Sequence, residues 1–134
     1  MTGIINLKIG DPLKTIVLDP VSRLDLIKYA GASGDFNPIH TIDDEAKKAG
    51  LPGVIAHGMW TMGNLAKLFS EYLEDGYIEN YSIRFKNMVF LNDVISLNSM
   101  LEKVEENKLH FKVEAKNQNN VSVLVGKILF KLYE

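Results

Sequence analysis

The spacing of apolar residues changes from a helical to a strand-like period near the middle of the chain. From Gly58 to about Leu73, apolar residues recur at steps of three and four, which is typical of one face of an α-helix. After Asp75-Gly76, apolar and polar residues alternate, as they do in half-buried strands. The alternation covers four segments, namely 81–85, 95–101, 109–115 and 121–132. The pattern predicts one long buried helix followed by four strands.

The links between the four predicted strands are short and rich in turn-forming residues. They read Leu91-Asn92-Asp93, Glu105-Glu106-Asn107 and Asn117-Gln118-Asn119-Asn120. Links of this length usually join antiparallel neighbours. We therefore expect an antiparallel meander in which consecutive strands pair.

The first part of the chain predicts a strand and two short helices. Thr15 to Leu18 is a short run rich in β-branched and apolar residues, typical of a strand. Ser22 is a good N-cap for a helix that reaches about Ala32 and ends near Gly31 or Gly34. A second short helix begins with the acids at 43–45 and stops at 50, with its charges matched to the helix dipole.

The size and charge of the chain favour one domain without a nucleic-acid role. With 134 residues, 46% of them hydrophobic, residues 1–134 can build one compact core but hardly two. The formal net charge is -2, and no long block carries a single sign, so nothing indicates a nucleic-acid partner. The absence of cysteine excludes disulfides and thiolate chemistry.

No segment of the sequence resembles a membrane anchor or a signal peptide. Apolar runs fall short of the roughly 18 residues needed to span a bilayer. Residues 1–10 lack an apolar run followed by a small-residue cleavage site. We therefore expect a soluble, cytoplasmic protein with no membrane partner.

Gly34-Asp35-Phe36-Asn37-Pro38-Ile39-His40 is the segment that most strongly indicates chemistry. Asn-Pro favours a turn and keeps Asn37 out of helical geometry, so a rigid loop is expected. An ordinary turn explains the glycine, Asn37 and Pro38. It does not explain why Asp35 and His40, two side chains with different ordinary pKa values, bracket that turn.

A second segment, Ala56-His57-Gly58-Met59, follows just before the predicted long helix. The first N–H groups of a helix have no intrahelical partner and lie at the positive end of its dipole. Gly58 would let a carbonyl oxygen approach such an N–H closely. A carboxylate, an imidazole and this donor together suit proton transfer beside a polarised carbonyl. A glycine chosen only for backbone reasons remains the alternative for Gly58.

Metal and cofactor chemistry find little support in the sequence. The histidines are His40, His57 and His110, and they form no His-x-x-x-His pair. No cysteine stands near them as a further ligand. We predict no metal and no cofactor.

The two segments together resemble the MaoC-like dehydratases, also called R-specific enoyl-CoA hydratases, whose signature contains Gly-Asp-x-Asn-Pro-x-His. The resemblance runs from about Pro20 to Met62 and includes residues 32–40 and 54–59 at the family's spacing. It implies an α+β hotdog fold, in which an antiparallel β-sheet wraps around one long central helix. One departure lies at residues 85–93, where many relatives carry proline and glycine that this chain lacks.

The resemblance also implies a reaction and a set of roles. Asp35 and His40 correspond to the catalytic dyad, Gly58 to the oxyanion hole, and Asn37 and His57 to supporting residues. The implied activity is (R)-specific hydration of trans-2-enoyl-CoA or acyl-carrier-protein thioesters to (3R)-hydroxyacyl thioesters, and the reverse dehydration. Relatives pair two such folds through a continuous sheet, so a homodimer is expected.

Two other functions stay open for a chain of this kind. A hotdog acyl thioesterase needs a water-activating group beside the same helix terminus, but it has no reason to carry the Gly-Asp-x-Asn-Pro-x-His motif. A non-catalytic acyl-thioester-binding subunit of a heterodimeric dehydratase has no reason to keep both Asp35 and His40. Trp60 also admits two roles, either as a wall that limits acyl chain length or as a core residue.

Overall fold

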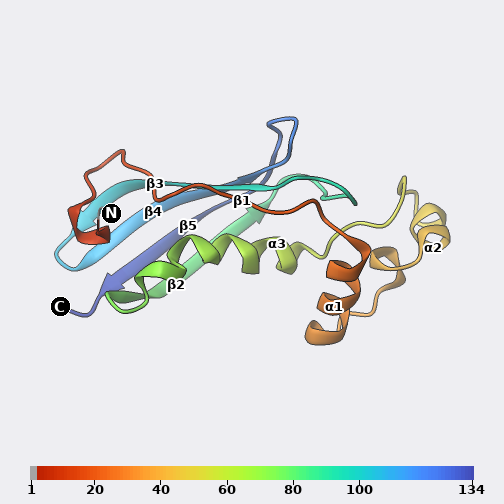
Figure 1. The fold of residues 1–134 in the computed structure, drawn as a ribbon, viewed down its shortest axis with the longest axis horizontal. Coiled ribbons are helices and arrows are strands. Elements are labelled where there is room, and N and C mark those ends of the chain that lie inside the picture. The colour runs from red at the N-terminus through yellow and green to blue at the C-terminus, as the bar shows by residue number, and fades with distance from the viewer. Residues whose placement is uncertain (1–2) are drawn as a thin grey trace.

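The computed structural model describes residues 3–134, which form an antiparallel sheet with a helix against one face (Figure 1). The strands are β1 (Ile16–Val17), β2 (Gly76–Phe85), β3 (Ser96–Glu105), β4 (Lys108–Lys116) and β5 (Ser122–Leu132). The α-helices are α1 (Arg23–Ser33), α2 (Asp43–Lys48) and α3 (Gly58–Leu65). Short 3₁₀ segments are η1 (Ile4–Asn6), η2 (Pro38–His40) and η3 (Ala66–Tyr72). The predicted strands and helices thus all have counterparts in the structure.

The order of strands across the sheet is β1-β3-β4-β5-β2. β3, β4 and β5 pair consecutively as an antiparallel meander, as predicted. The predicted pairing of the strand at 81–85 with the next strand is wrong, because β2 is an edge strand that pairs with β5. β3 instead receives β1 on its free side.

The link between β2 and β3 explains this difference. The Ala56 N–H donates to the carbonyl of Val89 over 2.8 Å, and Ile55 forms a β-bridge with Phe90. The link therefore pairs with the chain that leads into α3 and does not make a hairpin. Asp93 does form the expected local turn, since its carboxylate accepts from the N–H of Phe90 over 2.8 Å.

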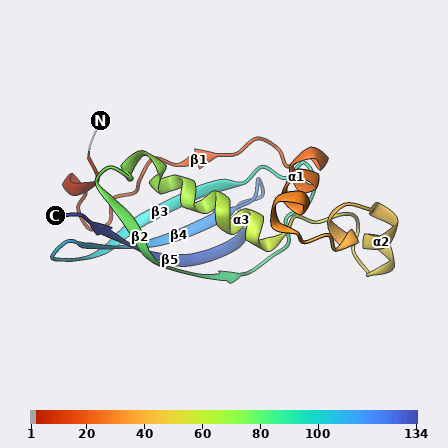
Figure 2. The same ribbon diagram turned by 90° about the horizontal axis from the view of Figure 1, so that it is seen from below.

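The central helix lies along the sheet, as both ribbon views show (Figures 1 and 2). Leu65, Leu68 and Phe69 are buried against the strands, and the Phe69 ring stacks on Phe130 with ring centroids 5.4 Å apart. The predicted helix to about Leu73 is partly wrong in type, because the α-helix ends at Leu65 and a 3₁₀-helix continues to Tyr72. A 3₁₀ turn has about three residues, which keeps Leu68 in line with Leu65.

The helix is also less buried than predicted. The sheet covers one face, and the ends of the apolar stripe stay open, with Met59 55% and Leu73 54% exposed. The core-facing residues of the strands, including Leu101, Phe111 and Ile128, supply the other side of the core. The apolar residues in the middle of the predicted helix are thus buried in the core, and those at its two ends are exposed.

α1 and α2 extend beyond one end of the sheet in both views (Figures 1 and 2). Ser22 caps α1, because its hydroxyl accepts from the N–H of Asp25 and the Asp25 carboxylate accepts from the N–H of Ser22, 3.0 Å each. Gly34 ends α1 in the left-handed conformation with φ 76°, which a glycine adopts without strain. The cap and the stop direct the chain into the loop 34–40, next to the start of α3.

Within residues 3–134, none of the helices combines the length and the apolar character needed to cross a membrane.

Candidate active site

Hydrogen bonds between residues two apart in the loop hold Asp35 in a fixed turn. The N–H of Asp35 donates to the Ser33 hydroxyl over 3.1 Å, and the N–H of Asn37 donates to Oδ1 of Asp35 over 3.2 Å. The Asn37 side chain accepts from the N–H of Ile39 over 3.2 Å and so begins the 3₁₀ turn η2. Asx turns of this kind form because short carboxyl and amide side chains reach the backbone two residues on. Asn37 therefore shapes the loop.

His40 is buried and presents one ring nitrogen to Asp35. Its Nδ1 lies 2.7 Å from the carbonyl oxygen of Ile55, which can only accept, so Nδ1 carries a proton. In the neutral ring Nε2 is then the free base, and it lies 3.8 Å from Oδ2 of Asp35. The His40 side chain is 9% exposed and the Asp35 side chain 52%. The loop thus brings together the carboxylate and imidazole that the sequence singled out.

His57 lies directly behind the dyad. Its Nε2 donates to the backbone carbonyl of Asp35 over 3.0 Å, and its ring stacks on that of His40 with centroids 3.7 Å apart. The Tyr29 ring meets His57 edge-on at 4.8 Å. His57 is 2% exposed. His57 thus contacts both members of the dyad, and its supporting role stays a prediction.

Asp35, His40 and His57 also bring three possible metal-ligand atoms within 4.8 Å of one another. The sequence did not signal this cluster, because its members come from separate segments. The stacked rings keep their ring nitrogens in nearly parallel planes, and Nε2 of His57 already donates to a carbonyl. The expected absence of a metal stays a prediction.

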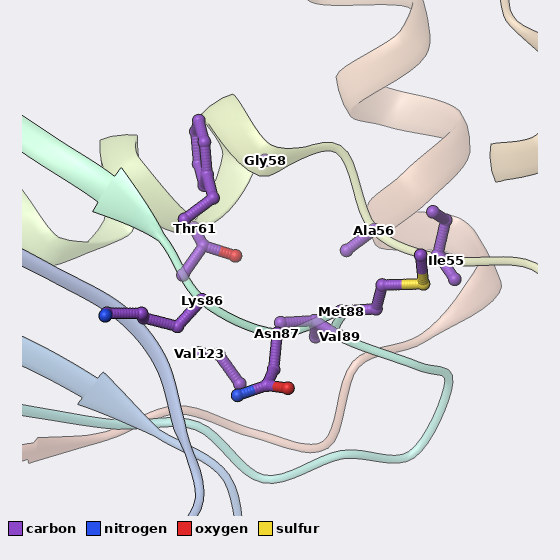
Figure 3. Close-up of a pocket in the computed structure, with 10 residues that line it drawn as sticks. Ile55, Ala56, Gly58, Thr61, Lys86, Asn87, Met88, Val89 and Val123 are labelled. Carbon is purple, nitrogen blue, oxygen red and sulfur yellow. The ribbon is translucent and has the colours of Figure 1, made fainter.

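A pocket of about 280 Å³ opens beside the first residue of α3 (Figure 3). Its wall contains Ile55, Ala56, Gly58, Thr61, Phe85, Lys86, Asn87, Met88, Val89 and Val123. Most of these side chains are apolar, which suits an acyl chain more than a charged ligand. Asp35 and His40 do not line the pocket, but Ile55 does, and its carbonyl holds the His40 ring. Ile55 therefore joins the dyad to the pocket.

Gly58 stands at the point where the pocket wall meets the start of α3. A Cβ at this position would lie 2.7 Å from Cε1 and 2.9 Å from Cζ of Phe85. Close packing is therefore one sufficient reason for the glycine, and the predicted role of its N–H as a donor to a carbonyl stays a prediction. Trp60 packs against the core and is not part of the pocket wall, which favours its structural role.

The sequence did not point to the Ile55 carbonyl or to the far wall of the pocket. A backbone acceptor has no residue-type signature, so nothing at position 55 could mark it. Phe85 and Val123 meet because β2 pairs with β5, with Phe85 opposite Leu124. That pairing is the one that the sequence misassigned.

Comparison with known proteins identifies the family of the chain. A family model described as "MaoC like domain" matches residues 5–123. The chain is 30% identical over 119 residues to the fatty acid synthase subunit beta of Saccharomyces cerevisiae, a match that covers 87% of this chain. It spans only 6% of that yeast protein. It is 28% identical over 125 residues to the mitochondrial 3-hydroxyacyl-(acyl-carrier-protein) dehydratase of Arabidopsis thaliana, covering 90% of this chain and 74% of the plant protein.

A similar fold occurs in the unliganded R-hydratase of Pseudomonas aeruginosa. The two structures superimpose with a TM-score of 0.88 at 21% identity, covering 97% of this chain and 84% of the bacterial one. At that identity the likeness concerns the fold. The predicted fold, an antiparallel sheet curled around a central helix, is confirmed.

Proposed function

The chain belongs to the MaoC-like dehydratase family, and on that premise we propose that it hydrates trans-2-enoyl thioesters to (3R)-hydroxyacyl thioesters and catalyses the reverse dehydration. The observation that carries the proposal is the 3.8 Å separation between Oδ2 of Asp35 and Nε2 of His40. This gap is too long for a direct hydrogen bond. A water oxygen about 2.8 Å from each atom would fit it. The same water would be the reactant in hydration.

In hydration, Asp35 acts as the base and His40 as the acid. The Asp35 carboxylate takes a proton from the water, whose oxygen bonds to C3 of the enoyl chain. The charged His40 ring gives its Nε2 proton to C2, and the C2=C3 double bond becomes a single bond. In dehydration, neutral His40 removes the C2 proton and protonated Asp35 gives its proton to the leaving hydroxyl. Nδ1 of His40 keeps its proton throughout and donates it to the Ile55 carbonyl.

Gly58 is proposed to stabilise the charge that develops on the thioester oxygen. An N–H at the start of a helix is preorganised for such an oxyanion, and the pocket beside it offers apolar walls for the acyl chain. The substrate is a thioester of CoA or of an acyl carrier protein. The plant relative is named for a carrier-protein substrate.

The test is turnover of crotonyl-CoA and of a crotonyl carrier protein, followed by the absorbance of the enoyl thioester. Asp35→Asn and His40→Ala should each lower kcat by about 10²- to 10⁴-fold, the usual worth of general acid–base catalysis. His110→Ala is the matched control, since His110 lies on β4, where it pairs with Lys103 of β3 and Leu129 of β5. Wild-type turnover that neither substitution changes would refute the dyad.

The thioesterase alternative predicts a different product. Hydrolysis releases a free thiol, whereas hydration leaves the thioester intact. Thiol release at the rate of enoyl loss, measured with a thiol reagent on the same samples, would favour hydrolysis. No turnover together with tight binding of crotonyl-CoA would favour the binding-subunit alternative.

We further propose that the protein works as a homodimer. β2 is an edge strand of ten residues whose outer side has no neighbouring strand within residues 3–134. Long open edges in stable proteins are usually paired or blocked. A second copy pairing along β2 would lie close to Phe85 and hence to the pocket. Sedimentation equilibrium at micromolar concentration checks this, and a stable monomer would contradict it.

The remaining proposals concern extent and location. We propose that residues 1–134 fold as one domain, in agreement with the family match over residues 5–123. We propose a cytoplasmic location, which the lack of cysteine suits. Fractionation of cells expressing the tagged chain tests the location.

A further inference from the structure

His57 is a buried imidazole that the proposed proton transfers do not use. It is 2% exposed, and its Nε2 lies 3.0 Å from the backbone carbonyl of Asp35. A carbonyl only accepts hydrogen bonds, so this nitrogen must carry a proton. The bond ties His57 to the backbone of the loop residue whose carboxylate faces His40.

The face of the His57 ring contacts the other half of the dyad. The His40 ring stacks on it at 3.7 Å with an interplanar angle of 21°. Tyr29, from α1, packs edge-on against it at 4.8 Å. One side chain therefore holds Asp35 through its backbone, holds His40 through its ring, and is itself fixed by α1.

The surroundings of Nδ1, the second ring nitrogen of His57, disfavour a proton on that atom. Within the part of the chain that the structure describes, Nδ1 is buried and has no hydrogen-bond partner. A proton there would leave a buried donor unsatisfied, which is costly. It would also place a positive ring against His40, which must be positive when it donates to C2. The side chains that face His57 are Tyr29, Asp35 and His40.

We propose that His57 is the positioning residue of the site, held as a neutral ring with its proton on Nε2, so that the transferable charge of the stacked pair stays on His40. This inference rests on the proposed function for its catalytic consequence. The tautomer itself depends only on the structure. In this role His57 itself transfers no proton.

The first test reads the tautomer without any substrate. Long-range ¹H–¹⁵N correlation spectra of the ¹⁵N-histidine-labelled protein distinguish a protonated Nε2 from a protonated Nδ1. His57, assigned by comparison with a His57→Gln sample, should show the neutral form protonated at Nε2 at neutral pH. A signal of the form protonated at Nδ1, or of a doubly protonated ring, would overturn the proposal.

The second test separates donation from packing with two variants that both lose the ring. In His57→Gln, the amide nitrogen stands three bonds from Cβ, as Nε2 does, and can donate to the Asp35 carbonyl. In His57→Asn, the amide nitrogen is one bond shorter and cannot reach. Asparagine is a preferred N-cap, and His57 is the N-cap of α3, so His57→Asn should fold stably.

His57→Asn should lower kcat on the enoyl thioester by about 10- to 100-fold with little change in KM, as expected when reacting groups shift by roughly 1 Å. His57→Gln should recover about tenfold of that loss. Equal kcat values for the two variants at equal thermal stability would refute the positioning role. If the wild type hydrates no thioester, the proposed function fails, while the spectrum still decides the tautomer.

Discussion

Replacing Gly58 with alanine separates the two explanations for this glycine. The added Cβ would lie 2.7 Å from Cε1 of Phe85, whereas ordinary contacts begin near 3.4 Å. The Phe85 ring must therefore move by about 0.7 Å, the difference between these distances. Because Phe85 is 52% exposed, its ring can move toward solvent.

The cost in stability should be small. Overpacking of this kind costs about 1–3 kcal/mol of stability in a closed core. The cost of displacing a half-exposed ring should lie at the low end of this range. Alanine is favoured over glycine in helices by up to about 1 kcal/mol, which offsets part of that cost. We expect Gly58→Ala to lower the free energy of unfolding by about 1 kcal/mol or less.

The effect on catalysis should be larger. If the N–H of residue 58 receives the thioester oxygen, the added methyl group beside it obstructs the approach of that oxygen. Loss of one oxyanion donor lowers kcat by about 10²- to 10³-fold, equivalent to roughly 3–4 kcal/mol. The predicted loss in transition-state stabilisation thus exceeds the predicted loss in folding stability.

The assay compares kcat on crotonyl-CoA with unfolding in urea for the same samples. Gly63→Ala is the matched control, since Gly63 lies in the same helix and an added Cβ meets no atom within 4 Å. It should raise stability by about 0.5–1 kcal/mol and leave kcat unchanged. Repeating Gly58→Ala in a Phe85→Leu background removes the clashing ring carbons. The stability cost should then disappear while the kcat loss remains.

Two outcomes would refute this reasoning. Wild-type kcat in Gly58→Ala would mean that the thioester carbonyl does not approach this N–H. A kcat loss that vanishes in the Phe85→Leu background would mean that the glycine serves only to accommodate the ring. In either case the dyad could still act, but the oxyanion site would have to lie elsewhere.

Two further predictions concern the scaffold around the site. Burial raises the pKa of Tyr81 to about 12, and its hydroxyl donates to the Met62 carbonyl over 2.6 Å. Because the unfolded-state pKa is near 10, the stability from this residue should be complete below pH 10. This contribution to the free energy of unfolding should be lost as the pH rises toward 12. The free energy of unfolding of Tyr81→Phe, measured in urea, should not show that decrease. The Asp93 carboxylate accepts hydrogen bonds from the Phe90 N–H over 2.8 Å and from Gln118 Nε2 over 2.9 Å. Asp93→Ala should therefore lower the free energy of unfolding, measured in urea, by about 2–3 kcal/mol. A decrease under about 0.5 kcal/mol would contradict this prediction.

Local signals in the sequence predicted the parts of the fold that depend on neighbouring residues. Ser22 was predicted as the cap of α1 and Gly31 or Gly34 as its end, and the structure has the end at Gly34, because such features depend on backbone geometry within a few residues. The alternating segments matched four strands for the same reason. The partner of β2 could not be predicted in this way. It depends on the link 86–95 pairing with the chain before α3, which is a contact between distant segments.

The candidate site shows the same division. Asp35 and His40 could be singled out because one short loop carries both. The stack of His40 on His57 and the contact of Gly58 with Phe85 depend on tertiary packing, so no spacing rule could reveal them. The role of the Ile55 carbonyl could not be predicted, because every residue has a backbone carbonyl.

Four consecutive residues before and at the start of α3 connect the loop, the link and the pocket. The Ile55 carbonyl orients His40, the Ala56 N–H pairs with Val89, His57 holds the Asp35 backbone, and Gly58 lines the pocket. Each residue contacts a different part of the site, so their order along the chain sets the position of the dyad relative to the pocket. Ile55 and Ala56 make their contacts through backbone groups, and His57 makes its contact through its side chain. Substitutions that keep these contacts should therefore be tolerated. An insertion or deletion in this segment should not be tolerated, since one added residue would shift every later contact.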